Sequence, residues 1–251
     1  MHIFVRPSDS VAYYSQLFRI PMQLILDSNA SLTLTAGHAI KIPGFITRTY
    51  TIQRNDSLSQ IADKLNLHID ALLLMNPTLQ KETLKTGLKI MIPTRVTWRI
   101  VQGQQNYDYE TLRNDLHKLH TIYPFIRRNP IGHSVLNREI PSLFIGTGPK
   151  QLHFNAAFHA NEWITTPVLM TFLNDYLLAI TNNQLLRGVP MLAQYVETTL
   201  SIVPMVNPDG VDLVLNGLPP DEAVRDQLLK WNNGINDFSG WKANINGVDL
   251  N

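Results

Sequence analysis

His159 and Glu162 lie three residues apart in the stretch NAAFHANEW, where a strand-like run gives way to a helix-like one. An imidazole and a carboxylate on adjacent anchors can point at one ion, and zinc binds nitrogen and oxygen ligands of this kind. A catalytic zinc site has a further protein ligand and keeps one position open for water. The spacing therefore predicts half of a zinc site and raises the question of the third ligand.

No histidine elsewhere in the chain is a convincing third ligand. His153 shares a strand face with His159 by period-two alternation, but six strand residues at about 3.3 Å each separate them by about 20 Å. His133 lies in a strand-like segment before a turn, and nothing in the sequence places it near the pair. The remaining histidines belong to the N-terminal segment or to a solvated helix face: His2, His38, His68, His117 and His120.

The segment around the pair has the pattern of an α/β domain with a mixed sheet, because strands alternate with helices of crossover length. Strands are predicted at TWRIV, on both sides of SVLNRE, at QLHFNAAF and at LSIVPMV. Helices are predicted at NYDYETLRNDLHKLHTIYP, TPVLMTFLNDYLLAI, VPMLAQYVETT and DEAVRDQLLKW, with a loop at NPDGVDLVLNGLPP. His159 then stands at the carboxyl end of a strand, where open α/β sheets bind ligands.

The first hundred residues contain an internal duplication. Residues 5–29 align with residues 52–76 at an offset of 47, and GHAIKIP aligns with GLKIMIP at an offset of 50. Each copy is predicted to form a strand, two helices and a closing strand. In the second copy, Asp56 or Ser57 is the expected N-cap of the first helix. Tandem self-similarity of this kind marks small repeated modules. We therefore expect modules at 1–45 and 48–94, and a separate domain at 96–251.

Each copy resembles the LysM domain, which binds N-acetylglucosamine chains of peptidoglycan or chitin. The resemblance rests on the Asp-Ser before the first helix, the Asn after the second and the closing Gly-x-x-Ile-x-Ile-Pro strand. It implies a glycan groove between two loops of each module. The alternative is that the Asp and Ser residues only cap a helix. The implied glycan contacts are Asp56, Ser57, Leu58, Asn76, Pro77, Asp9, Ser10 and Asn29.

The rest of the chain resembles the carboxypeptidase A-like zinc metallopeptidases in the order of its motifs, FNAAFHANEW, IVPMVNPDG and GVDLN among them. This resemblance implies that His159 and Glu162 bind Zn²⁺ in the complete protein, and that Asn251 contacts the substrate carboxylate. By the same resemblance, Lys242 occupies the position of a family Arg that stabilises the oxyanion. A Lys at this position has the same positive charge, but it cannot donate the two parallel hydrogen bonds of a guanidinium. The alternative for Asn251 is that it only caps a turn, and the alternative for Lys242 is that it is a solvated surface residue.

LysM pairs ahead of such a domain resemble the bacterial γ-D-glutamyl-diaminopimelate endopeptidases, which trim peptidoglycan stem peptides. The family's third zinc ligand and its general-base Glu are expected beyond Asn251, so we predict no catalytic base in this chain, weak or absent zinc binding and little hydrolysis. We also expect an unpaired sheet edge and exposed apolar helix faces. The alternative function is a non-catalytic LysM protein that binds N-acetylglucosamine and carries a vestigial peptidase half.

Composition narrows the partners and the location. The formal net charge is +1, so no overall field favours nucleic acid or a membrane surface. The chain has no cysteine, which excludes thiol catalysis and zinc–cysteine sites. No signal peptide is visible at the start, and the apolar runs read as too short to span a bilayer. We expect peptidoglycan glycan and stem peptides as partners, in the cytoplasm or associated with the spore or cell wall of a bacterium.

Overall fold

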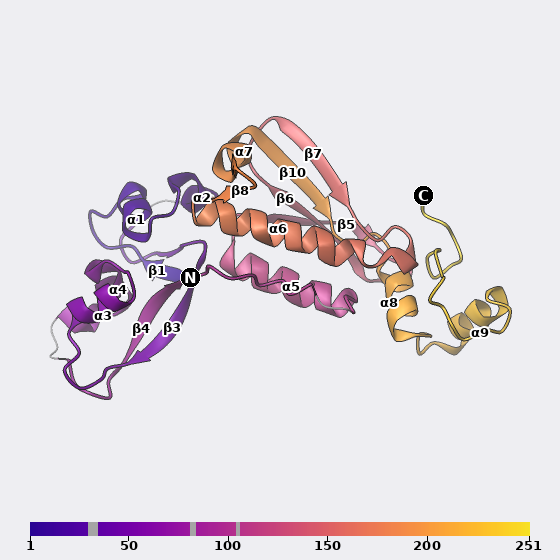
Figure 1. Cartoon of the computed structure of the whole chain (residues 1–251), viewed down its shortest axis with the longest axis horizontal. Helices are drawn as coiled ribbons and strands as arrows, with labels where there is room; N and C mark the ends of the chain where they lie inside the picture. The colour runs from indigo at the N-terminus through magenta and orange to yellow at the C-terminus, as the bar shows by residue number, and fades with distance from the viewer. Residues whose placement is uncertain (30–34, 81–83, 104–105) are drawn as a thin grey trace. The chain divides into compact units, whose positions relative to one another are not determined.

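The computed structural model describes residues 1–29, 35–80, 84–103 and 106–251, and it divides into two compact units (Figure 1). Unit 1 comprises Met1–Trp98, His120–Phe125 and Leu178–Gln184. Unit 2 comprises Arg99–Leu119, Ile126–Leu177 and Leu185–Asn251. The duplicated segment therefore lies in unit 1, and the His159 motif lies in unit 2.

Both repeats of unit 1 fold as strand, helix, helix, strand, as the sequence predicts. The first repeat consists of β1 (His2–Phe4), α1 (Val11–Phe18), α2 (Met22–Asp27) and β2 (Ala39–Lys41). The second consists of β3 (Phe45–Thr51), α3 (Leu58–Lys64), α4 (Ile69–Met75), a 3-10 turn (Pro77–Gln80) and β4 (Lys89–Arg95). In each repeat the opening and closing strands pair antiparallel.

The sequence alignment of the repeats corresponds to equivalent positions in space. Tyr14 of α1 and its aligned residue Ile61 of α3 are both fully buried, as are Ile40 and Ile90 of the closing strands. These positions fill the small cores because helical and strand periods both direct them inward. The second repeat's core is completed by Ile52, Ala62, Leu72, Leu79 and Ile92.

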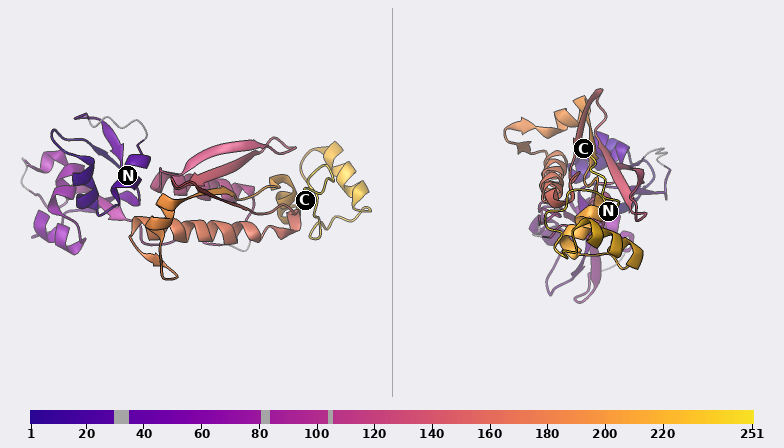
Figure 2. Two further views of the ribbon diagram at one scale, coloured as in Figure 1. Left: turned by 90° about the horizontal axis from the view of Figure 1, so that it is seen from above. Right: turned by 90° about the vertical axis from the view of Figure 1, so that its right-hand side faces the viewer.

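The sheet of unit 2 is mixed, as predicted. Its strand order is β5 (Arg127–His133), β6 (Glu139–Ile145), β10 (Thr198–Val203) and β7 (Lys150–Asn155). The β5–β6 and β6–β10 pairs are antiparallel, whereas β10 and β7 are parallel. A parallel pair needs a long crossover connection, and the segment between β7 and β10 contains α6 (Thr165–Thr181), which runs along the sheet (Figure 2).

The helices of unit 2 follow the predicted apolar stripes. In α5 (Tyr109–Ile122), Leu112, Leu116 and Leu119 are buried. The other elements are a short hairpin of β8 (Leu185–Leu186) and β9 (Val189–Pro190), α7 (Met191–Glu197), α8 (Pro208–Asn216) and α9 (Glu222–Trp231). Side chains of α8, α9 and the last segment form a separate small core of Leu213, Leu228, Phe238 and Ile245.

Two segments form a different element from the one predicted. The segment TWRIV forms no strand, because the backbone N–H groups of Ile100 and Val101 donate to the side chain of Asn174 on α6, at 2.8 and 3.0 Å, instead of to a neighbouring strand. The segment NPDGVDLVLN is the helix α8 and not a loop. Its turn-forming residues start the helix, with Asn207 as N-cap and Pro208 at the first helical position.

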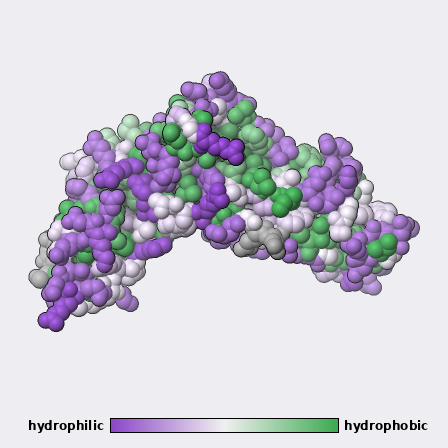
Figure 3. Space-filling view, in the orientation of Figure 1, coloured by the Kyte–Doolittle hydropathy of each residue, from purple (hydrophilic) through white to green (hydrophobic). Residues whose placement is uncertain are grey.

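Strand β7 is an edge of the described sheet, and apolar side chains around it are exposed. Leu152 and Phe154 of β7, and Val168 and Phe172 of α6, are between 38% and 66% exposed. The rings of Phe154 and Phe172 lie 6.0 Å apart. Figure 3 shows hydrophobic side chains gathered on this face, over β7 and α6. An edge strand beside an apolar helix face is what the sequence predicts here.

Among the described residues, one helical segment meets the length and hydropathy of a membrane span. Residues Ala160–Thr181 form 22 residues with a mean hydropathy of 1.2, and 56% of that window is buried inside the protein. A core helix of a soluble protein meets the same criteria, and α6 runs along the sheet. The expectation that every apolar run is too short for a bilayer is therefore wrong for this segment, while the expected absence of a membrane partner stays a prediction.

Candidate functional site

The chain leaves β7 before it reaches His159. The strand ends at Asn155, and Ala157 has a left-handed backbone with φ of +49°. The period-two alternation predicted from His153 to His159 is therefore wrong over its second half. His159 instead precedes a 3-10 turn (Ala160–Glu162), and this turn brings Glu162 back beside it.

The two predicted ligands converge on a shared point. The His159 Nδ1 atom and the Glu162 Oε1 atom lie 3.1 Å apart. Although this is ion-pair distance, Nδ1 is buried and has no hydrogen-bond partner among the described residues. A tetrahedral zinc ion with bonds of about 2.0–2.1 Å holds neighbouring ligand atoms about 3.3 Å apart. An unpartnered imidazole nitrogen and a carboxylate oxygen at this separation fit a zinc ion, so the residues match the metal predicted for them.

Asp249 contacts the opposite edge of the same imidazole. Its Oδ1 atom lies 3.3 Å from His159 Nε2. Metal-binding histidines commonly donate their second ring N–H to a carboxylate, which orients the ring and fixes its tautomer. Sequence reasoning missed this residue, although it stands two positions before Asn251 in the GVDLN segment. The contact joins residues 90 positions apart, so spacing along the chain could not reveal it.

The turn that carries the ligands is fixed by the last segment of the chain. The backbone N–H groups of Ala160 and Asn161 donate to the carbonyl oxygens of Lys242 and Trp241, each at 3.0 Å. The Asn207 side chain connects both segments, since its Nδ2 donates to Phe158 O at 3.2 Å and to Ala243 O at 3.0 Å. Residues 241–243 and the ligand turn are therefore held side by side.

Helix α8 packs closely on this turn because Gly210 has no side chain. A Cβ atom at Gly210 would lie 2.8 Å from the Ala160 Cβ and 2.6 Å from the Asn207 side chain. The same Asn207 caps α8 by accepting from the Gly210 N–H at 3.1 Å. The NPDG sequence is thus a helix start that supports the candidate site, and not the predicted loop.

Lys242 and Asn251 lie in segments that adjoin the ligand turn. The Lys242 side chain is exposed at a hollow of about 440 Å³ that Trp241 and Gly247 also line. Asn251 is exposed, and its backbone N–H donates to Asp249 at 3.2 Å. The links to the His159 turn are the Lys242 carbonyl, which accepts from Ala160 N–H, and Asp249, which contacts both Asn251 and His159. Their roles toward a substrate stay predictions.

The upstream histidines do not complete a metal site. His153 lies on β7, where its Nδ1 is 3.1 Å from the Oγ of Ser201 on the neighbouring strand. His133 is the last residue of β5 and pairs with Glu139 in the sheet register. Among the described residues, no group of three or more His, Cys, Asp or Glu side chains is arranged to hold a metal ion. The predicted metal ligands among the described residues therefore remain His159 and Glu162 alone.

The acidic and hydroxyl residues predicted for glycan binding all have structural contacts. Ser10 caps α1, and Ser57 caps α3 in a reciprocal pair with Gln60. Asp56 accepts from the Tyr50 hydroxyl at 2.9 Å and from a backbone N–H at 2.7 Å. Asp9 accepts from Arg6 Nε at 2.9 Å and from the Tyr14 hydroxyl at 2.8 Å.

The two predicted asparagines form the same clasp in both repeats. Asn29 Nδ2 donates to Ile25 O and Lys41 O, at 2.7 and 2.8 Å, and its Oδ1 accepts from Lys41 N at 2.8 Å. Asn76 Nδ2 donates to Leu72 O and Met91 O, at 2.8 and 2.7 Å, and its Oδ1 accepts from Met91 N at 2.8 Å. Each clasp ties the second helix to the closing strand.

The last two residues predicted for glycan binding open helices in the second repeat. Leu58 is the first residue of α3 and packs against the core, and Pro77 is exposed at the start of the 3-10 turn. Contact with glycan stays a prediction for this residue set as a whole. The structure adds that most of its side chains already stabilise the fold.

Unit 2 thus combines a mixed α/β sheet with a convergent His–Glu pair beyond its parallel edge strand, and a duplicated βααβ module precedes it. The zinc carboxypeptidase family model matches residues 112–251, which is more than half of the chain, and the chain belongs to this family. The LysM domain model matches residues 50–93, the second repeat.

Similar proteins include curated relatives and solved structures. The chain is 56% identical over 254 residues to gamma-D-glutamyl-L-diamino acid endopeptidase 1 of Lysinibacillus sphaericus, covering 100% of this chain and 64% of that protein. It is 43% identical over 153 residues to the uncharacterized protein YqgT of Bacillus subtilis (strain 168), covering 60% and 41%. A solved metallo-carboxypeptidase from Burkholderia cenocepacia matches with 21% identity and a TM-score of 0.38, covering 57% and 38%. The chain therefore spans less than two thirds of the length of each of these proteins.

Proposed function

We propose that the protein is a zinc peptidase that acts on peptidoglycan, hydrolysing γ-D-glutamyl–diamino acid bonds of the stem peptides while its LysM repeats bind the glycan. The observation that carries the proposal is the buried, unpartnered His159 Nδ1 beside Glu162 Oε1. Membership of the zinc carboxypeptidase family and the printed activity of the Lysinibacillus relative support it.

The residues of this chain divide the work at the site. His159 and Glu162 would hold the ion, and Asp249 would accept a hydrogen bond from His159 Nε2–H, which leaves Nδ1 as the nitrogen free to bind a metal. Bound zinc lowers the pKa of a water ligand and polarises a scissile carbonyl. Lys242 supplies positive charge for a developing oxyanion, and the Asn251 amide donates to a substrate carboxylate.

Zinc titration tests the metal half of the proposal. We expect the wild-type protein to bind zinc weakly in calorimetry, because two protein ligands are present among the described residues. His159→Ala and Glu162→Ala should each remove the binding. His38→Ala, at an exposed histidine in unit 1, is the matched control and should leave it unchanged. Equal zinc affinity in His159→Ala and wild type would refute the assignment.

A peptide assay tests the reaction. The substrate is a γ-D-glutamyl-diaminopimelate peptide, incubated with the protein in chelator and in added zinc. The proposal predicts that any cleavage of the γ-D-glutamyl bond requires zinc and disappears in Glu162→Ala. Retention on insoluble peptidoglycan with no cleavage at saturating zinc would instead support the alternative, a non-catalytic glycan-binding protein. Cleavage in chelator would contradict both.

The same proposal places the protein on bacterial wall material, either associated with the spore or cell wall or acting on recycled wall fragments in the cytoplasm. The support is the LysM match and the Lysinibacillus relative. Fractionation of cells and spores, followed by detection of the protein in each fraction, tests it. Recovery in a fraction that contains no wall material or wall fragments would argue against it.

A further inference from the structure

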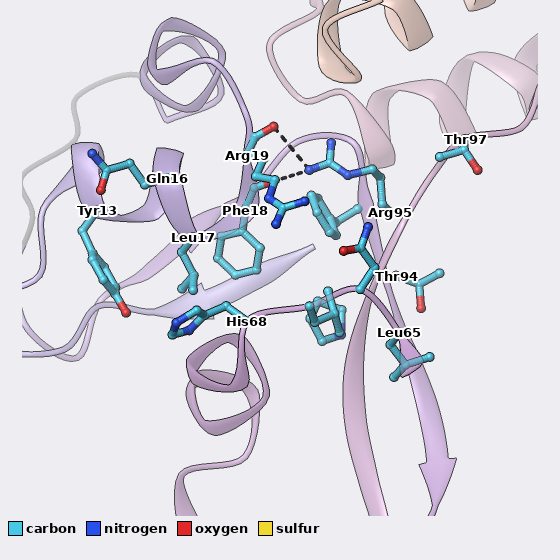
Figure 4. Close-up of a pocket in the computed structure, with 14 residues that line it drawn as sticks. Tyr13, Gln16, Leu17, Phe18, Arg19, Leu65, His68, Thr94, Arg95 and Thr97 are labelled. Carbon is cyan, nitrogen blue, oxygen red and sulfur yellow. Dashed lines mark hydrogen bonds between the residues drawn. The ribbon is translucent and has the colours of Figure 1, made fainter. Parts of the chain in front are cut away.

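Unit 1 contains a cleft of about 510 Å³ between the two repeats (Figure 4). One wall is the last part of α1 and the residue after it, and the other is the turn 65–68 that joins α3 to α4. The first residue of β3, Phe45, and the last residues of β4, Pro93–Arg95, also line it. The residues predicted to bind glycan do not line this cleft, so it is a second, separate candidate site.

A charged network fixes the distance between the two walls. Arg6 of the first repeat donates to both carboxylate oxygens of Asp70 in α4, at 2.9 and 2.6 Å. Tyr13, which lines the cleft, donates its hydroxyl to the same carboxylate. A bidentate Arg–carboxylate pair adds geometric specificity to its energy. The cleft is therefore formed before any ligand arrives.

Two guanidinium groups at the cleft have no carboxylate partner. Arg95 Nη1 donates to Thr181 O at 3.0 Å, and its Nη2 donates to the carbonyl oxygens of Phe18 and Arg19. Burial and repulsion by Arg19 both lower the pKa of Arg95. The Arg19 side chain is exposed and has no partner among the described residues. Because no Asp or Glu of the described residues lines the cleft, its positive charge is uncompensated.

The backbone at Arg19 is unfavourable for the residue it carries. Arg19 ends α1 in the left-handed region with φ of +48°. Its aligned residue in the second repeat, Asn66, has φ of +51°, and Asn tolerates this region far better than Arg. Arg19 therefore occupies a backbone position that suits Asn better, which makes it a candidate for a role outside the fold.

The rest of the lining is apolar and aromatic. Phe18 and Phe45 stand edge-to-face with ring centroids 5.4 Å apart, and Leu65 and Leu67 come from the opposite wall. A cation beside such a surface suits a ligand that carries a carboxylate next to aliphatic groups. An uncharged N-acetylglucosamine chain would leave both guanidinium groups without a counter-ion.

We propose that this cleft binds the carboxylate-bearing stem peptide of peptidoglycan, with Arg19 contacting a carboxylate and the apolar wall contacting the aliphatic part. The choice of peptide rests on the proposed function. The cleft would then hold the peptide portion of the wall polymer, while the LysM loops hold its glycan.

Calorimetric titration with γ-D-glutamyl-diaminopimelate, in chelator so that the zinc site plays no part, tests the proposal. Arg19→Asn should weaken binding by about tenfold or more, since a charge-assisted hydrogen bond is lost. The melting temperature should hold or rise, because Asn suits the left-handed backbone. Arg19→Lys should keep part of the affinity. Arg54→Asn, which removes an exposed charge of the second repeat away from the cleft, is the matched control and should bind like wild type.

Further titrations distinguish this cleft from the predicted metal site and the predicted glycan site. The same peptide with its carboxylates amidated should not bind, and an N-acetylglucosamine oligomer should not compete. His159→Ala should bind the peptide as wild type does, even if hydrolysis is never observed. Unchanged binding in Arg19→Asn, equal binding of the amidated peptide, or loss of binding in His159→Ala would each overturn the proposal.

Discussion

The two repeats of unit 1 have the same fold and the same asparagine clasp, yet their loops have different partners. Asn29 and Asn76 make matching hydrogen bonds to a helix and a closing strand. By contrast, Arg6 in the first repeat pairs with Asp70, while the aligned Gln53 is exposed. The residues that hold each repeat together are thus the same in both repeats, whereas residues outside the repeat core differ between them.

This difference in partners means that the first repeat contacts its neighbour, whereas the second repeat makes bonds within itself. In the first, Tyr13 points to the second repeat through Asp70, whereas the aligned Gln60 turns back to cap its own helix with Ser57. The first repeat's loop is committed to the contact between repeats. The loop before α3 in the second repeat makes local bonds and keeps its outer side open, and this is the repeat that the LysM family model matches.

Replacement of either clasp asparagine should have the largest effect on stability. Asn29→Ala and Asn76→Ala each remove hydrogen bonds to three backbone groups, and unsatisfied groups of this kind cost about 1–3 kcal/mol. We expect both variants to be destabilised by about 2–3 kcal/mol in thermal or urea unfolding. Gln16→Ala, at an exposed helix position, is the control and should change little. A large loss in one repeat and none in the other would break the equivalence of the clasps.

Removal of the charge at Asp70 should affect the contact between repeats more than either fold. Asp70→Asn loses the ion pair with Arg6, and we expect a loss of about 1 kcal/mol. NMR relaxation should then report independent tumbling of the repeats. Asp63→Asn removes an exposed carboxylate of the same repeat and should have no such effect. Unchanged relaxation in Asp70→Asn would show that the pair does not fix the repeats.

Loss of a helix cap should reduce the stability of either repeat by a smaller amount. Ser57→Ala loses a reciprocal capping pair with Gln60, while Ser10→Ala loses a single bond to Tyr13 N at 3.1 Å. We expect about 1 kcal/mol for Ser57→Ala and about half of that for Ser10→Ala. Urea unfolding of the two variants measures the order. The reverse order would mean that the first repeat depends more on its cap than its single bond indicates.

Low pH should weaken the Arg6–Asp70 contact between the repeats. Of the changes considered, this one should have the smallest effect on stability. Hydrogen bonding from Arg6 holds the pKa of Asp70 below its ordinary value of 3.8. A depressed carboxyl pKa means that this stability is present above pH 3.8 and is lost as the pH falls through the folded-state pKa. The stability difference between wild type and Asp70→Asn should be constant above about pH 5 and shrink below about pH 4. A difference that grows in acid would contradict this sign.

Residue type and spacing were enough for the repeat, the mixed sheet and the convergence of His159 with Glu162. The repeat was visible because buried positions such as Tyr14 and Ile61 recur at a fixed offset and set the apolar period of each helix. His159 and Glu162 were visible because a single local turn brings them together. The misread helix α8 shows the limit of this reasoning, since Asn207 and Pro208 serve a helix start as well as a loop.

Contacts between distant segments could not be read in this way. Asp249 beside His159, Asn207 between two loops and Arg6 with Asp70 join residues that are 90, 36–49 and 64 positions apart. Chain order determined that this protein has a duplicated module and a His–Glu pair after a strand. Packing decided which carboxylate contacts the histidine and where two arginines without a carboxylate partner line one cleft. Hydrogen bonds and burial depend on distance in space, and local sequence patterns carry no information about that distance.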